Sequence, residues 1–183
     1  ESYKLVIGGL LFFALFNSSD VFLLLKGKES GLNDTQVIGV YVFYNIVYAL
    51  LSYPLGALAD KIGLKRVLVF GLFVFSFVYL VMSTKFSFPI YFAMFFLYGL
   101  YAAATEGVSK ALISNIAAKS EIATAIGTFT AFQSVCALLA STLTGVLWAK
   151  FNASVALIVT SVASLLVAIY FIFFVRVKII KQE

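Results

Sequence analysis

The chain has 183 residues, of which 63% are hydrophobic and only 11% are charged. A soluble domain averages about 45–50% apolar and about 25% charged residues. A soluble domain of this length cannot bury so many apolar side chains. A disordered chain is also excluded, because disorder requires low hydrophobicity and high charge. We therefore expect an integral membrane protein in the lipid bilayer, and we interpret the net charge of +5 as a signal of topology and not of nucleic-acid binding.

The length and the apolar runs indicate the architecture. A membrane helix with its short loop takes about 30 residues, so the chain accommodates six. The runs are continuous and longer than the alternating segments of about ten residues that form membrane β-barrels. We expect an all-α polytopic membrane protein, with residues 1–183 as a single six-helix transmembrane domain. The expected spans are about 5–25, 36–58, 67–83, 88–116, 122–148 and 154–175.

The distribution of Lys and Arg predicts the orientation, because these residues accumulate in cytoplasmic loops. An even number of spans places both termini on one side, which holds Lys4, Lys61, Lys65, Arg66, Lys119, Arg176, Lys178 and Lys181. The opposite side holds fewer, namely Lys26, Lys28, Lys85 and Lys150, and Lys110 lies inside the fourth span. We therefore expect both termini in the cytoplasm.

The first expected span carries a polar run at residues 17–20, which begins with Asn17 and ends with Asp20. Ionisable groups inside a membrane are costly and usually functional. Asp20 can be an interfacial carboxylate paired with Lys26 or Lys28. It can also be an acid that faces a cavity and binds a proton or a cation.

The second, third and sixth expected spans differ in polarity. In the second span, Tyr41, Asn45 and Tyr48 fall on one helical face. This face suits a hydrogen-bonding cavity wall, or contacts between helices, for which a lone Asn is commonly used. The third and sixth spans contain no charged residue, so they tolerate lipid over most of their surface.

The fourth expected span carries Glu106 and Lys110, an acid and a base four residues apart in the favourable order. The pair can be structural, with each charge neutralising the other, or it can handle a substrate or a proton. A stripe of small residues on the same helix suits close packing of another helix. Its members are Gly99, Ala103, Gly107 and Ala111.

The fifth expected span carries two ladders of small residues, which predict a position deep in a bundle. They are Ala123, Gly127 and Ala131, then Ala137, Ser141 and Gly145. Gln133 is the one large polar residue of this span and could contact a solute.

The chain offers little for catalysis or for a bound cofactor. It has no histidine and a single cysteine, Cys136, which excludes an internal disulfide, a cysteine metal cluster and a histidine-ligated metal. The sequence shows no nucleophile with a matching base and no phosphate-binding loop. We therefore expect no enzyme activity, no cofactor and no metal.

The segment between the second and third spans has the most specific pattern, since residues 56–68 read GALADKIGLKRVL. It resembles the signature loop of the major facilitator superfamily of secondary transporters, G-x-L-a-D-r-x-G-r-k-x-x-l. Leu64 departs from the basic residue that is usual there, although Arg66 follows shortly after. In the family this loop is a conformational latch. The resemblance implies that role for Gly56, Asp60, Lys61, Gly63, Lys65 and Arg66.

Three later stretches are similar to bacterial members of the same family. They are TEGVSKA at residues 105–111, TAIG at 124–127 and GVLW at 145–148, after which Ala149 and Asn152 replace the usual Asp and Gly. The resemblance implies the C-terminal half of a fold of two six-helix halves, in a bacterial inner (cytoplasmic) membrane. In that half the first and fourth helices would line the cavity, and the third and sixth would face lipid.

The resemblance implies half of a transporter that moves a small solute by alternating access, by symport or antiport and with protons as one coupling ion. The candidates for contact with solute or proton are Glu106, Lys110, Asp20, Asn17, Asn45 and Gln133. Because the first residue is Glu1 and not Met, we expect an excerpt of a longer protein. The other cavity wall would come from an N-terminal half or from a second copy in a homodimer. The alternative is a non-transporting scaffold or assembly subunit that binds partner helices.

Overall fold

The computed structural model describes residues 2–175, and in this range it contains helices and no strands. The helices are α1 (Ser2–Ala14), α2 (Val21–Glu29), α3 (Asp34–Ile62), α4 (Leu64–Met82), α5 (Phe88–Ile116), the 3₁₀ turn η1 (Lys119–Glu121), α6 (Ile122–Lys150) and α7 (Ala153–Phe173). Helices α3 to α7 are long and apolar enough to cross a membrane, and α1 is a shorter apolar helix. The expected all-α polytopic fold is confirmed.

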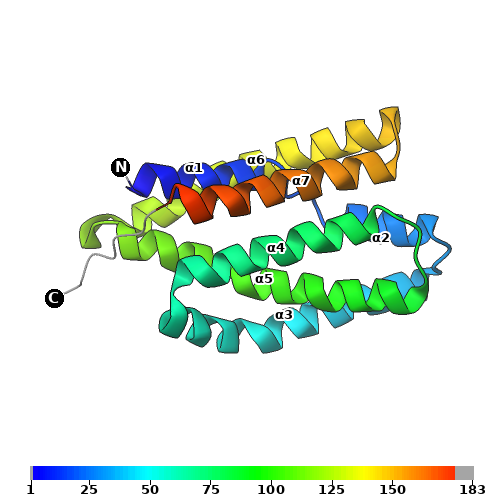
Figure 1. Ribbon diagram of the computed structural model, residues 1–183, viewed down its shortest axis with the longest axis horizontal. Helices are drawn as coiled ribbons and strands as arrows, with labels where there is room; N and C mark the ends of the chain where they lie inside the picture. The colour runs from blue at the N-terminus through cyan, green and yellow to red at the C-terminus, as the bar shows by residue number, and fades with distance from the viewer. Residues whose placement is uncertain (1, 176–183) are drawn as a thin grey trace.

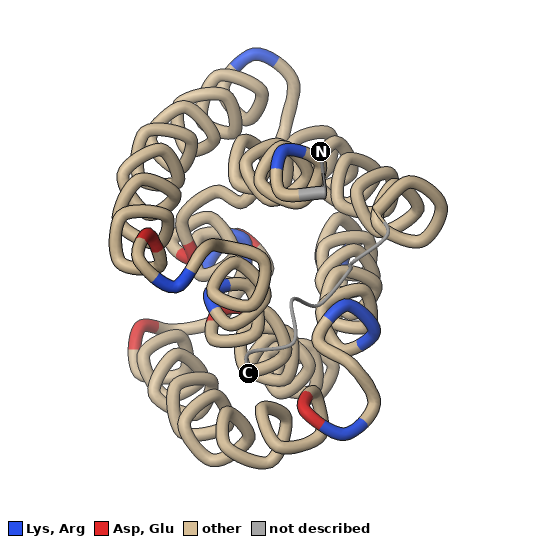
Figure 2. Tube along the Cα trace, turned by 90° about the vertical axis from the view of Figure 1, so that its left-hand side faces the viewer, with Lys and Arg blue, Asp and Glu red and all other residues tan. Residues whose placement is uncertain are grey.

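The helices form an elongated bundle, and all connections but the one between α1 and α2 lie at its two ends (Figure 1). The start of α1, the α3–α4 turn, η1 and the end of α7 lie at one end, and the α2–α3, α4–α5 and α6–α7 connections lie at the opposite end. The α1–α2 connection lies part-way along the bundle. Figure 2 views the bundle from the first end, where charged residues gather at the turns and long stretches of helix carry none. The bundle thus separates two groups of basic residues as the sequence predicts, although Arg176, Lys178 and Lys181 lie outside the described residues.

The expectation of one continuous helix over residues 5–25 is wrong, because α1 ends at Ala14 and α2 begins at Val21. The polar run at residues 17–20 explains the break, since short polar side chains compete with the helical ladder for backbone groups. The backbone N–H of Ser19 donates to the hydroxyl of Ser141 on α6 (3.2 Å). Thirteen residues of α1 rise about 20 Å, so the break lies within the apolar thickness of a bilayer.

Helix α5 lies at the centre of the bundle and packs against both α3 and α4. Gly99 permits the close approach of α3, since a Cβ there would lie 2.8 Å from Val47 and 3.0 Å from the carbonyl oxygen of Tyr44. A Cβ at Gly107 would meet nothing within 4 Å. The small-residue stripe of α5 therefore packs a neighbouring helix at Gly99 and leaves open space at Gly107.

Helices α4 and α7 bury their hydroxyl groups against each other. Ser76 donates to the carbonyl oxygen of Ser161 (2.9 Å), and Ser161 donates back to that of Ser76 (2.6 Å). Ser164 donates to the carbonyl oxygen of Leu72 (3.1 Å). The outward faces of both helices carry large apolar side chains, including Phe70, Phe73, Phe77, Ile158, Val162 and Ile169. These faces suit lipid, because the polar groups are satisfied inside the bundle.

Helix α6 does not lie deep within this bundle, contrary to the expectation. Its buried residues are Ala125, Phe129, Ala140 and Thr144. Phe132, Val135 and Leu138 are exposed, and a Cβ at Gly127 would meet nothing within 4 Å. Small residues predict that a helix can be approached closely, but the described part of this chain supplies no helix that approaches α6 on that side.

The turn between α3 and α4 depends on Gly63, whose backbone angles are φ +105° and ψ +130°. Gly56 of the same motif lies inside α3, and a Cβ there would meet nothing within 4 Å.

We predict that Gly63→Ala destabilises the protein by about 1–3 kcal/mol, because side-chain-bearing residues rarely adopt such backbone angles. Thermal unfolding in detergent should show a lower Tm for Gly63→Ala. Gly56→Ala is the matched control and should leave Tm unchanged or slightly higher, since alanine favours a helix interior. Equal Tm values for both variants would contradict the role of Gly63.

Candidate functional site

A polar pocket of about 260 Å³ lies where α1, the break after it, α5 and α6 meet. Its lining residues are Leu10, Phe13, Asn17, Tyr101, Thr105, Glu106, Ser109, Lys110, Phe129 and Gln133. Four predicted candidates, Asn17, Glu106, Lys110 and Gln133, therefore come together from three parts of the chain. The pocket contains both an acidic and a basic side chain at the depth of the transmembrane helices.

Glu106 and Lys110 do not form an ion pair with each other, whereas Lys28 and Asp34 are joined by one (2.6 Å). Glu106 instead accepts a hydrogen bond from the hydroxyl of Tyr48 on α3 (2.8 Å). An exposed pair four residues apart on a helix contributes only about 0.2–0.5 kcal/mol, whereas a hydrogen bond to a carboxylate is stronger. The acid and the base therefore face the pocket as separate charges.

The remaining polar groups of the pocket are held in defined positions. The side-chain amide of Asn17 donates to the hydroxyl of Tyr101 (3.1 Å). Ser109 donates to the carbonyl oxygen of Thr105 (2.6 Å), and Thr105 donates to that of Tyr101 (2.9 Å), so both hydroxyl oxygens can still accept a bond from a ligand. With one carboxylate, one ammonium and two amides, the pocket can bind a small solute that carries both donors and acceptors.

Asp20 and Asn45 lie outside this pocket. Asp20 accepts a hydrogen bond from the hydroxyl of Tyr98 on α5 (2.6 Å). Asn45 is exposed, and its side-chain amide donates to the carbonyl oxygen of Tyr41 in its own helix (2.8 Å). The structure thus separates two of the six candidates from the other four.

The motif at the α3–α4 turn contacts the end of α7 through Lys65. The ammonium of Lys65 donates to the carbonyl oxygens of Ile172 (3.2 Å) and Val175 (2.7 Å). Carbonyl groups at a helix C-terminus attract a cation, because they lack partners within the helix. Asp60, Lys61 and Arg66 are exposed, and Gly63 forms the turn.

Several residues of the site were not predicted. Tyr98, Tyr101, Thr105 and Ser109 recur at intervals of three and four along α5, so they form a polar stripe on one helical face. The stripe was detectable in the sequence. Tyr48 was predicted to share a face with Asn45, but its bond to Glu106 depends on how α3 packs against α5.

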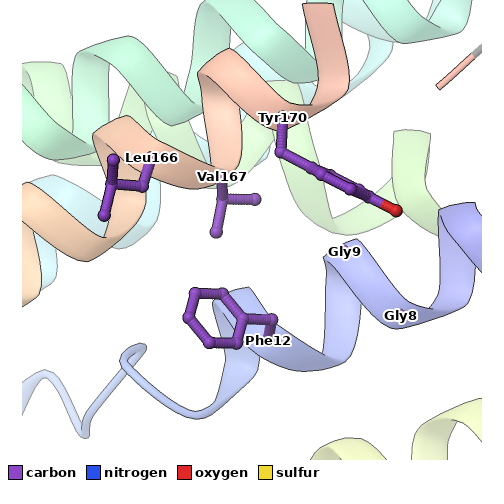
Figure 3. A pocket seen from close by; sticks show the side chains of 6 residues that line it. All are labelled: Gly8, Gly9, Phe12, Leu166, Val167 and Tyr170. Atoms are coloured by element: carbon purple, nitrogen blue, oxygen red, sulfur yellow. The ribbon is translucent and has the colours of Figure 1, made fainter. Parts of the chain in front are cut away.

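A second pocket, of about 310 Å³, lies between α1 and α7 (Figure 3). Its lining residues are Gly8, Gly9, Phe12, Leu166, Val167 and Tyr170. The hydroxyl of Tyr170 donates to the carbonyl oxygen of Leu5 (3.1 Å). This lining contains no charged side chain, and the polar pocket is therefore the better candidate for a polar solute.

Within residues 2–175, no group of three His, Cys, Asp or Glu side chains is arranged to hold a metal ion.

Comparisons with known proteins agree with the resemblance of the loop. The sequence model of the Major Facilitator Superfamily matches residues 5–182. An uncharacterised MFS-type transporter from Methanocaldococcus jannaschii is 36% identical over 142 residues, which cover 74% of this chain and 36% of the relative. The chain thus spans about a third of the length of that relative.

We predict that Lys65→Met destabilises the protein by about 1 kcal/mol, because the carbonyl groups at the end of α7 lose their cation. For a chain of this length the loss corresponds to a decrease in Tm of about 2–4 °C, measured by thermal unfolding in detergent. Lys61→Met is the matched control, since Lys61 is exposed and has no hydrogen-bond or ion-pair partner among the described residues. A Tm of Lys65→Met equal to that of Lys61→Met would show that the contact does not stabilise the fold.

Proposed function

The chain belongs to the major facilitator superfamily, and from this premise we propose that it forms the C-terminal six-helix half of a secondary active transporter. The transporter moves a small polar solute across the membrane by alternating access. In this mechanism two halves rock about a central site, so that the site opens to each side of the membrane in turn.

The polar pocket is the observation that carries this proposal. It places Glu106 and Lys110 beside Asn17 and Gln133 on one wall. Charged side chains at membrane depth are expensive, and they commonly mark the path of a solute or an ion. Because acid and base are not paired with each other, each can bind a group of opposite charge on the solute.

The second wall of the site comes from another six-helix body, either an N-terminal half or a second copy in a homodimer. The exposed faces of α3 and α6 support this proposal. They carry large apolar side chains, including Ile38, Val42, Ile46, Phe132, Val135 and Leu138. The first small-residue ladder of α6 is open at Gly127, so another helix can approach closely there.

Glu106 is the best placed group in this pocket to couple the solute to a proton. Its carboxylate is exposed to the pocket, and the hydroxyl of Tyr48 is 2.8 Å away. A proton on Glu106 would remove one of the two charges of the pocket and so change its affinity for the solute. This coupling would give symport or antiport, depending on whether proton and solute bind together or in turn.

A scaffold or assembly subunit is the second candidate function. The long exposed apolar faces of α3 and α6 favour it, because a scaffold would use them to bind partner helices. Such a subunit has no need of a pocket that contains an acid and a base. The pocket therefore favours transport.

We predict that Glu106→Gln in the complete transporter abolishes solute accumulation driven by a pH gradient. The assay is uptake into proteoliposomes, where a panel of radiolabelled amino acids and sugars first identifies a solute carried by the wild type. Glu121→Gln is the matched control, because Glu121 is exposed and lies outside the pocket. Accumulation by Glu106→Gln with the rate and pH dependence of the wild type would overturn the coupling role. A wild type that moves no solute of the panel would favour the scaffold.

We also predict that the chain occurs in an assembly with a second six-helix body. Native mass spectrometry of the solubilised protein should find it joined to an N-terminal half or paired with a second copy. A species with the mass of one 20.0 kDa chain, in mild detergent and at all protein concentrations, would contradict this prediction.

A further inference from the structure

The break between α1 and α2 lies against a second cluster of polar side chains, separate from the solute pocket. We call it the break cluster, and it consists of Ser18, Asp20, Tyr79 of α4 and Tyr98 of α5. The hydroxyl of Tyr98 donates to a carboxylate oxygen of Asp20 (2.6 Å), and Ser18 and Tyr98 are the polar neighbours of the Tyr79 hydroxyl. Ser18, Tyr79 and Tyr98 are 3%, 0% and 2% exposed, whereas Asp20 is half-buried, so the cluster is closed to solvent except at Asp20.

The carboxylate of Asp20 accepts a hydrogen bond from Tyr98 but has no cation as a partner. Asp20 is the N-cap residue of α2, yet its side chain makes no capping hydrogen bond. Lys28 forms its ion pair with Asp34, and no Lys or Arg of the described residues lies within 4 Å of the Asp20 carboxylate. A half-buried carboxylate at membrane depth is costly unless it is protonated or paired with a cation.

Two hydroxyl groups of the cluster are also without partners. The hydroxyl oxygens of Ser18 and Tyr79 are fully buried and are neighbours of each other, but neither makes a hydrogen bond of normal geometry within the described residues. Buried polar groups are nearly always satisfied, and an exception calls for a bound water or ion. The two hydroxyls without a hydrogen bond and the carboxylate without a cation belong to the same cluster, so a single bound cation can satisfy all three.

The chemistry of the cluster matches a small alkali cation. All its polar atoms are oxygens, which are the ligands of hard cations. One carboxylate neutralises a single positive charge, so a divalent ion would leave an uncompensated charge in a medium of low dielectric constant. The C-terminal end of α1, whose dipole attracts cations, also faces the break. Interrupted membrane helices coordinate Na⁺ in this manner in other transporter folds.

We propose that the break cluster is a sodium site, in which the Asp20 carboxylate and the hydroxyl oxygens of Ser18 and Tyr79 bind the ion. Tyr98 is a positioning residue, since its hydroxyl holds one oxygen of Asp20. The role of the ion in transport rests on the proposed function, whereas its binding is a property of the folded protein alone.

The sodium site and the solute pocket share the segment of residues 17–20. Asn17 lines the pocket and donates to Tyr101, whereas Ser18 and Asp20 belong to the break cluster. The rings of Tyr98 and Tyr101 are in contact, with centroids 5.3 Å apart. Binding of Na⁺ therefore holds the segment that positions Asn17, and it raises the affinity of the pocket for its solute.

The test is the thermal stability of the purified complete transporter in detergent, titrated with NaCl against choline chloride at constant ionic strength. A ligand that binds only the folded protein raises its Tm. We expect Na⁺ to raise the Tm of the wild type. Asp20→Asn should increase the Na⁺ concentration for half of this effect by at least about tenfold. The control for the loss of a carboxylate is Asp34→Asn, which should respond to Na⁺ like the wild type.

Tyr79→Phe distinguishes a sodium ligand from a merely buried hydroxyl. Loss of an unsatisfied buried hydroxyl should leave the Tm in choline chloride unchanged or higher. If Tyr79 binds the ion, the same variant should lose most of the increase caused by Na⁺. Tyr91→Phe is the matched control, because the buried Tyr91 donates to the carbonyl oxygen of Leu23 (3.0 Å) and lies outside the cluster. It should lower the Tm in both salts and retain the response to Na⁺.

Three results would overturn the proposal. The first is an equal Tm of the wild type in NaCl and in choline chloride. The second is a response to Na⁺ that Asp20→Asn and Tyr79→Phe both retain. The third is a stability that depends on pH through Asp20 but not on Na⁺, which would make the cluster a proton site. None of these measurements requires solute transport, so a failed sodium site leaves the transport proposal intact, and sodium binding without any solute flux would count against transport alone.

Discussion

The interruption of the first membrane segment is the constraint on which the rest of the site depends. A chain that leaves the helical ladder inside a bilayer must find partners for its backbone and polar side chains within the protein, because lipid offers none. Ser141 of α6 accepts from the backbone of Ser19, Tyr98 of α5 donates to Asp20, and Tyr101 accepts from Asn17. The break thus draws α5 and α6 together around it, and the polar pocket forms at the same place.

Helix α5 connects this polar region to the apolar packing of the bundle. Its close contact with α3 depends on Gly99, and the same contact brings Tyr48 of α3 to Glu106. One face of α5 therefore packs tightly while the adjacent face carries tyrosines, hydroxyls and charges. Helices α4 and α7 lie on the other side, where their serines bond to each other and leave apolar faces outward. The hydroxyl groups shared by α4 and α7 and the polar stripe of α5 are directed inward or to the pocket, whereas Asn45 of α3 is exposed and bonds to its own helix.

Much of the fold was predictable from the sequence, because long apolar runs separated by charged turns have few alternatives. The break in the first segment was not predicted, since hydrophobicity over residues 5–25 remains high enough for a continuous helix. The position of α6 also differs from the one that its small residues predict. Its small residues, such as Gly127, show that a helix can come close, but they do not show whether that helix belongs to the same chain. Among the candidates, Asn17, Glu106, Lys110 and Gln133 share a pocket, whereas Asn45 bonds within its own helix.

The sequence by itself determined the membrane location, the helical class, the family and the identity of the charged residues at membrane depth. These follow from composition and from local spacing, which act over a few turns of helix. Only the tertiary structure decided which charges are paired, because that depends on distances between helices far apart in the chain. Glu106 and Lys110 are neighbours on one helix, yet Tyr48 takes the place of Lys110 as the partner of the carboxylate. Lys65 likewise finds its partners at the end of α7, more than one hundred residues away.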